Sequence, residues 1–252
     1  RPKTAPVRNA SRPFSSPLRP WGSRKNTGTG SMDFLSLYVT LKLALVATIL
    51  LLLIAAPIAY VLAYAHFPGK ALFEALIYLP IALPPTVMGF YLILAMGPKG
   101  AVGRAWGLLT GGSLLFTFLG IVAASVLYSI PFAVQPIKAA FLKIDPRLLE
   151  NASVLGLSRF AAFVRVVLPN SIGGMAAASI LVFLHTIGAF GVLLMVGGSV
   201  PGVTKVASIA VYEAVEAMDY RTAGWMSLCF IPISYIFLLL VNRLNGEARH
   251  GA

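Results

Sequence analysis

Few side chains in this sequence have the types and spacing that catalysis requires. Glu213 and Glu216 lie three residues apart in a predicted short helix over residues 206–217, where acid/base chemistry is conceivable but a solvated helix face is favoured. The stretch FPGKALF around Lys70 lacks the first glycine and the hydroxyl of a phosphate-binding loop. No group of His and Cys has metal-ligand spacing. The chain is therefore expected to be no enzyme and to need neither metal nor cofactor.

Two further reactive side chains lie in apolar runs. His185 falls inside a predicted membrane span, where an ionisable group is a functional candidate by default. Its neutral ring also suits a hydrogen bond to a neighbouring helix, and we favour that structural role over gating. Cys229 is the single cysteine, and we interpret it as a small packed hydrophobe.

Composition places most of the chain in a lipid bilayer. Of the 252 residues, 58% are hydrophobic and 11% are charged, which is more apolar surface than a soluble domain of this length buries. Seven of the twenty Lys and Arg lie in residues 1–31, a stretch rich in Pro, Ser and Gly. We interpret these residues as a disordered basic leader outside the inserted protein, which we expect to begin near Met32. No basic face is interleaved with aromatics, so nucleic acid is not an expected partner.

An all-α integral membrane fold with about five transmembrane helices is predicted for residues 32–243, followed by a cytoplasmic tail over 244–252. Each span is long enough to cross about 30 Å of hydrocarbon at about 1.5 Å per residue, and lipid requires each to be helical. The expected spans are Leu43–Ala65, Ala71–Met96, Leu114–Val134, Ile172–Val196 and Ala223–Val241.

The second span is interrupted by prolines. Pro80, Pro84 and Pro85 remove backbone donors and kink the helix, and Gly89 follows them. Such breaks are tolerated where neighbouring helices or a water-filled pathway compensate. A kinked packing helix and a transport pathway are both consistent with this pattern. After the fourth span, glycines and Pro201 predict a turn before the 206–217 helix, which is too short to cross and is expected at an interface.

Loop charge predicts the orientation. If the loop over residues 145–169 is cytoplasmic, inside loops carry more Lys and Arg than outside loops, as the positive-inside rule requires. The inside set is Lys70, Lys138, Lys143, Arg147, Arg159, Arg165, Arg243 and Arg249, and the outside set is Lys99, Arg104, Lys205 and Arg221. The basic leader would lie outside, against the same rule, which is a second reason to place it apart from the inserted protein.

That cytoplasmic loop has the signals of two short helices. Asp145 and Pro146 suit the start of the first helix, Gly156 permits a sharp turn, and Ser158 suits the cap of the second. Apolar side chains available for docking a partner are Leu155, Leu157, Phe160 and Phe163.

The spacing in this loop resembles the coupling-loop signature of the membrane subunits of type I ATP-binding-cassette (ABC) importers. The matching positions are Glu150, Ala152, Gly156, Val166, Leu168 and Pro169, with Asn151 where the family usually has alanine. The stretches over residues 67–100 and 188–220 resemble molybdate and tungstate permeases in particular. One departure is Ala189, in a Gly-Ala-Phe-Gly run where such permeases often carry Gly-Glu-Phe-Gly.

This resemblance implies a multi-pass permease subunit of the cytoplasmic membrane of a prokaryote. Its partners would be two copies of an ABC ATPase subunit, a second copy of itself and an extracytoplasmic molybdate-binding protein. The six matching positions would couple the chain to the ATPase. The expected pathway residues are Pro84, Pro85, Thr86, Gly89 and His185, and the expected binding-protein contact is the turn at Pro201 and Gly202.

Three alternatives remain open at this point. The same architecture could carry sulfate or another oxyanion. A secondary transporter or channel would work without ATP, which the coupling pattern disfavours. A membrane scaffold would only recruit partners, which the proline-broken span disfavours.

Overall fold

The computed structural model describes residues 33–250, with side chains to residue 239, and these residues contain helices and no strands. The leader over residues 1–31, the suggested start at Met32 and the last two residues lie outside the described part. The helices are α1 (Phe34–Tyr64), α2 (Lys70–Ala82), α3 (Pro85–Met96), α4 (Ala101–Thr110), α5 (Phe118–Phe141), α6 (Pro146–Val154), α7 (Arg159–Ala162), the π-helix η1 (Phe163–Val167), α8 (Leu168–Asn170), α9 (Ile172–Gly188), α10 (Gly191–Gly197), α11 (Ala207–Glu216) and α12 (Tyr220–His250).

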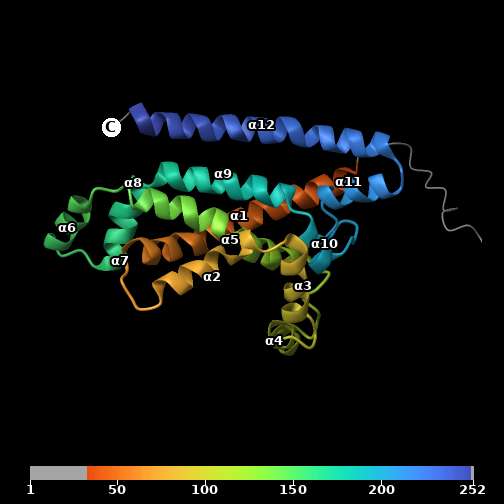
Figure 1. The fold of residues 1–252 in the computed structure, drawn as a ribbon, viewed down its shortest axis with the longest axis horizontal. Helices are drawn as coiled ribbons and strands as arrows, with labels where there is room; N and C mark the ends of the chain where they lie inside the picture. The colour runs from red at the N-terminus through yellow and green to blue at the C-terminus, as the bar shows by residue number, and fades with distance from the viewer. Residues whose placement is uncertain (1–32, 251–252) are drawn as a thin grey trace, which may run out of the picture. The chain divides into compact units, whose positions relative to one another are not determined.

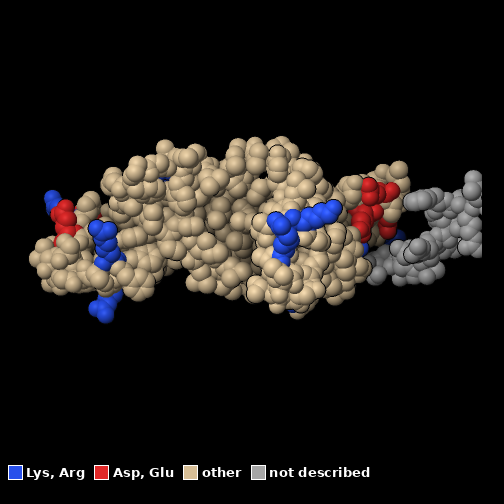
Figure 2. All heavy atoms as spheres, turned by 90° about the horizontal axis from the view of Figure 1, so that it is seen from below, with Lys and Arg blue, Asp and Glu red and all other residues tan. Residues whose placement is uncertain are grey.

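Helices α1, α5 and α9 pack side by side and form the core, with α2 against α5 and α12 against α9 and α11 (Figure 1). Small buried residues on all three, such as Ala55, Ala133 and Ala178, allow the backbones to approach closely. Large apolar side chains such as Leu53 and Ile231 stay exposed, as lipid contact requires. On the face shown in Figure 2, charged side chains gather at the α6–α7 end, over α4 and near α11, and the surface between them is uncharged.

The predicted membrane architecture is confirmed, with corrections to its boundaries. By length and composition, α1, α5 and residues Tyr220–Leu239 of α12 are single helices able to cross a membrane. The number of candidate spans rises to as many as five if each of two bent helix pairs counts as one span; the pairs are Lys70–Ala82 with Pro85–Met96, and Arg159–Asn170 with Ile172–Gly188. The third expected span, Leu114–Val134, begins later because Thr117 caps α5 by accepting from Gly120 N at 3.1 Å. It also ends later, at Phe141.

The longer α5 moves Lys138 from an expected cytoplasmic loop onto a helix. There its amine forms an ion pair with the carboxylate of Glu74 on α2. A charge pair at this place fixes α2 against α5 and leaves neither charge alone near lipid.

The proline-rich second span, expected over residues 71–96, consists of two helices, α2 and α3, with a bend of 114° between them. Pro84 has extended backbone angles, because the ring of Pro85 disfavours a helical residue before it, and Pro85 then starts α3. The fourth expected span, Ile172–Val196, is also divided. Helix α9 ends at Gly188, Ala189 is extended, and α10 begins at Gly191.

An ion triad joins α1 to the segment before α11. The Lys205 amine lies 3.4 Å from an Asp33 carboxylate oxygen and 2.9 Å from a Glu213 carboxylate oxygen. Asp33 also caps α1, accepting from Ser36 N at 3.1 Å. The predicted 206–217 helix is confirmed as α11, and its Ala207 N–H donates to the Thr40 hydroxyl oxygen of α1 at 2.7 Å.

The triad shifts the pKa values of its members. Partial burial raises the pKa of Asp33, but hydrogen bonding by Ser36 and the charge of Lys205 outweigh it, so the pKa is lowered from 3.8. Partial burial lowers the pKa of Lys205, but its hydrogen bonds and charge interactions with Glu213 and Asp33 outweigh it, so the pKa is raised from 10.5. The stabilisation is therefore present at neutral pH. It is lost as pH falls through the folded pKa of Asp33, or rises through that of Lys205.

We predict that Lys205→Met lowers the thermal midpoint of the detergent-solubilised protein. The pairs are partly exposed, so each contributes only about 0.5 kcal/mol after solvent screening. The difference from wild type should be largest near about pH 7 and should shrink towards about pH 3, as Asp33 is protonated. Lys99→Met is the control, since Lys99 forms no ion pair within the described residues. An equal midpoint for the two variants at neutral pH would contradict the triad's role.

Candidate functional site

The segment over residues 145–171, which the loop charges predict to be cytoplasmic, has the predicted form of two helices joined by a glycine turn. Asp145 caps α6 by accepting from Arg147 N at 3.0 Å. Gly156 has φ +75°, a left-handed conformation that glycine adopts without strain. Ser158 then caps α7 by accepting from Ala161 N at 3.2 Å. The second helix is longer than predicted, because α7, η1 and α8 run on to Asn170 before a bend of 76° into α9.

The six positions of the coupling signature divide between the surface and the interior of this segment. Glu150, Gly156 and Pro169 are exposed, whereas Ala152 is 4% exposed, and Val166 and Leu168 are half-buried. Asn151 is exposed, as expected for a tolerated replacement of alanine. The signature therefore contains residues that shape the segment as well as residues a partner could touch. Its role in coupling stays a prediction.

The tip of the segment carries exposed apolar side chains. Val154, Leu155 and Phe160 are 85%, 78% and 76% exposed. Arg147 of α6 and Arg159 of α7 are also exposed. Charged side chains gather at this end of the molecule (Figure 2). This combination of an apolar tip and a charged border is typical of a protein-docking surface.

Phe163 was expected to be another docking side chain, and this expectation is wrong. Its ring packs inward, 4.9 Å from the Tyr60 ring of α1 and 6.2 Å from the Phe141 ring of α5, between ring centroids. The Tyr64 hydroxyl ties the same helices together by donating to the Phe141 carbonyl at 2.6 Å. Val167, one turn after Phe163, is fully buried in the same cluster. This aromatic cluster is a direct contact between the predicted cytoplasmic segment and helices α1 and α5.

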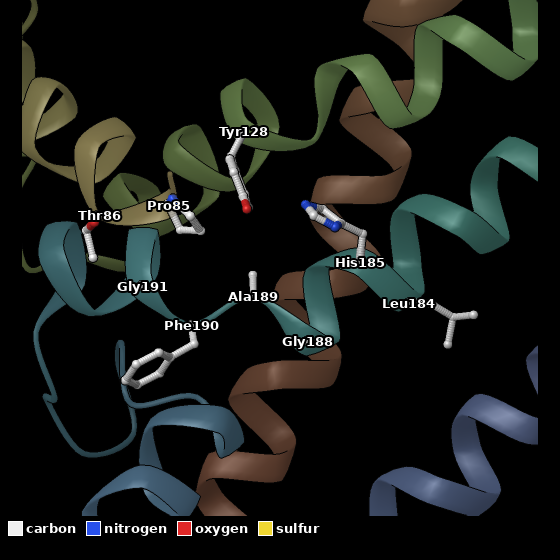
Figure 3. Close-up of a pocket in the computed structure, with 9 residues that line it drawn as sticks. All are labelled: Pro85, Thr86, Tyr128, Leu184, His185, Gly188, Ala189, Phe190 and Gly191. Atoms are coloured by element: carbon white, nitrogen blue, oxygen red, sulfur yellow. The ribbon is translucent and has the colours of Figure 1, made fainter. Parts of the chain in front are cut away.

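A cavity of about 430 Å³ lies where the two broken spans meet (Figure 3). Its lining residues are Pro85, Thr86, Tyr128, Leu184, His185, Gly188, Ala189, Phe190 and Gly191. The breaks touch, since a Cβ built on Gly191 would lie 3.2 Å from Pro85 Cβ. Thus Pro85, Thr86 and His185, three predicted pathway residues far apart in the sequence, are brought to one place.

Two predicted pathway residues do not line this cavity. Pro84 precedes it at the helix break. Gly89 is buried, and a Cβ built there would lie 2.8 Å from Met195 Cβ, so its role is close packing of α3 on α10. Tyr128 and Phe190 line the cavity and were missed. The glycines near Phe190, Gly188 and Gly191, were a sequence signal for a helix break that could have pointed to this residue. Tyr128 lies inside the continuous helix α5, so no sequence feature pointed to it.

His185 does not make the hydrogen bond expected of it. Its ring stacks on Phe132 with centroids 3.9 Å apart, and its centroid lies 5.0 Å from that of Tyr128. The Nε2 atom is buried without a hydrogen-bond partner among the described residues. The ring is therefore fixed by aromatic packing at the edge of the cavity.

The turn containing Pro201 and Gly202 is exposed at the α11 end of the fold. Gly202 has φ +74°, and Thr204 holds the turn by donating to the Gly197 carbonyl at 2.6 Å and accepting from Val200 N at 3.1 Å. A contact of this turn with a binding protein stays a prediction. Within residues 33–250, the structure has no group of three or more His, Cys, Asp or Glu arranged to hold a metal ion.

Comparison with known proteins identifies the fold and the family. Residues 55–247 match the family model described as "Binding-protein-dependent transport system inner membrane component". The chain is 43% identical over 206 residues to the molybdenum transport system permease protein ModB of Azotobacter vinelandii, covering 82% of this chain and 91% of that protein. It is 31% identical to the sulfate transport system permease protein CysT of Escherichia coli, covering 83% of this chain and 75% of that protein.

A solved structure shares this fold at low sequence identity. It is a bacterial ABC transporter involved in the import of the acidic polysaccharide alginate, with a TM-score of 0.66 and 18% identity, covering 87% of this chain and 80% of that chain. Together with the membrane-spanning helices, the match over residues 55–247 shows that this chain is an integral membrane protein and belongs to the family of binding-protein-dependent transport system inner membrane components.

Proposed function

We propose that this chain is the permease subunit of an ATP-driven importer that moves molybdate, or the similar dianion tungstate, across the cytoplasmic membrane of a prokaryote. The choice of substrate is supported by the 43% identity to a molybdenum transport permease over most of both chains. The ATP-driven mechanism is supported by the cytoplasmic segment. This segment has an exposed apolar tip, and its aromatic root, the Phe163 ring, packs between Tyr60 of α1 and Phe141 of α5.

In this proposal ATP is bound and hydrolysed by a separate subunit. The sequence has no glycine-rich loop for a nucleotide phosphate, and the apolar tip at Leu155 and Phe160 suits a cleft on an ATPase. Two copies of this chain would enclose the pathway, two ATPase subunits would lie against their cytoplasmic segments, and a molybdate-binding protein would dock outside. ATP on one side and the loaded binding protein on the other would bias the populations of inward-open and outward-open states.

Transmission would run from the tip to the membrane through the segment's buried root. Closure of the ATPase subunits would move α6 and α7 as one body, because the capped helices and the Gly156 turn fix their relative angle. The rings of Phe163, Tyr60 and Phe141 would pass this displacement to α1 and α5. Packed side chains suit this role because they resist compression.

The substrate is tested with the reconstituted complex in proteoliposomes. We predict that molybdate-loaded binding protein raises ATP hydrolysis and drives anion uptake. Sulfate is the specific alternative, favoured by the 31% identity to CysT. Stimulation by a sulfate-binding protein with none by the molybdate-binding protein would contradict the molybdate proposal, and ATP-independent uptake would contradict the mechanism.

Gly156→Val is predicted to uncouple hydrolysis from uptake. A Cβ at this position meets no atom within 4 Å, so the expected effect of valine is strain in the left-handed backbone, at a cost of about 1–2 kcal/mol. Gly156→Asn is the control, since asparagine tolerates this conformation. Uptake per ATP should fall several-fold for valine and change little for asparagine. Equal uptake by both would show that the turn geometry does not matter.

Phe163 and Phe160 provide a matched pair, one buried and one exposed. Phe163→Leu removes the ring contacts with Tyr60 and Phe141, so ATPase subunits should still copurify while uptake per ATP falls several-fold. Phe160→Leu should have the opposite effects. Fewer ATPase subunits should copurify with it, and uptake per ATP in the complexes that do assemble should stay near the wild-type value. If the two variants behave alike, the division into tip and root is wrong.

A further inference from the structure

The cavity between the broken spans has an unusual polar lining for an anion pathway. Of its nine lining residues, none is Asp, Glu, Lys or Arg, and the polar side chains are Thr86, Tyr128 and His185. Position 189 contributes a methyl group, so no carboxylate faces the cavity. Any polar solute there would meet hydroxyls, an imidazole and backbone groups, and no fixed charge.

His185 is held beside this space with an unsatisfied nitrogen. Stacking on Phe132 and contact with Tyr128 restrict the ring, and Figure 3 shows it pointing towards the same space as the Tyr128 hydroxyl. Its buried Nε2 has no hydrogen-bond partner within the described residues. A buried polar atom left unpaired costs about 1–3 kcal/mol. A neutral imidazole always has one nitrogen that donates, so it can serve an anion as a donor.

Other donors surround the cavity. Tyr128 and Thr86 each carry a hydroxyl and line the cavity. Thr86 also lies in the first turn of α3, a helix of 12 residues, where backbone N–H groups have no partner within the helix and favour anions. The volume of about 430 Å³ exceeds a water's share of about 30 Å³ many times, so an anion could keep part of its hydration shell.

We propose that His185 and Tyr128, with the first turn of α3, form a contact site for a tetrahedral oxyanion within the membrane, and that His185 is a specificity-determining residue of transport. This rests on the proposed function as an oxyanion importer. Neutral donors suit a transit site, because hydrogen bonds of about 0.5–1.5 kcal/mol each replace lost hydration without trapping a dianion as a fixed cation would. The absence of acid side chains from the lining removes a source of repulsion.

The test compares variants that keep or remove the donor at position 185. His185→Leu keeps an apolar side chain of similar size without a donor, and His185→Gln keeps an N–H donor. In proteoliposomes with ATPase and molybdate-binding protein, molybdate uptake per ATP should fall about five- to tenfold for leucine and less than about twofold for glutamine, as expected for one lost hydrogen bond. Tyr128→Phe, which removes one oxygen atom, should lower the same ratio and is a second test if leucine at position 185 prevents folding.

The outcomes separate this inference from the proposed function. Wild-type uptake per ATP in both His185→Leu and Tyr128→Phe would overturn the contact site while leaving the importer intact. Equal losses for leucine and glutamine would also overturn it, because they would show that ring packing on Phe132 matters and the donor does not. A wild-type complex that carries no oxyanion would overturn the proposed function itself.

Discussion

In a lipid bilayer every backbone amide and carbonyl needs a partner, and each group left without one costs several kcal/mol. Two membrane segments of this chain are nevertheless broken, one at Pro84 and one at Ala189. A carbonyl at each break has a partner: the Pro84 carbonyl accepts from Met88 N at 3.1 Å, and the Ala189 carbonyl accepts from the Ser208 hydroxyl of α11 at 2.7 Å. Residues at both breaks line one cavity, and a cavity lining is where this constraint permits irregular backbone.

The predicted cytoplasmic segment, residues 145–171, is connected to helices α5 and α9 at their opposite end. Its aromatic root packs on α1 and α5, and it continues through a bend of 76° into α9, whose far end forms the cavity. A displacement of the segment thus has a packed route to the helices around the cavity. The ion pair of Glu74 with Lys138 gives α2 a further attachment to α5. This continuity is the physical basis for proposing that ATPase closure opens and closes the pathway.

Local chemistry explains which features could be predicted from the sequence. The break before Pro85, the cap at Asp145 and the left-handed Gly156 each depend on one or two neighbouring residues, so they were recognised. The break at Ala189 was missed because its run is apolar and glycine is common in membrane helices. At this break Gly191 lies close to Pro85, a contact between distant residues that no local pattern predicts. His185 and Phe163 were recognised as important, but their partners come from α5 and α1, which no local pattern specifies.

The central claim, that the cavity between the broken spans is part of the transport pathway, is tested most directly by thiol accessibility at position 86. The chain has a single cysteine, so Thr86→Cys in a Cys229→Ser background places one thiol at an exposed position of the cavity lining. A membrane-impermeant maleimide should label it from the cytoplasmic side without ATP. Labelling should shift to the outside with a non-hydrolysable ATP analogue and loaded binding protein. No labelling from either side in either state would contradict the account.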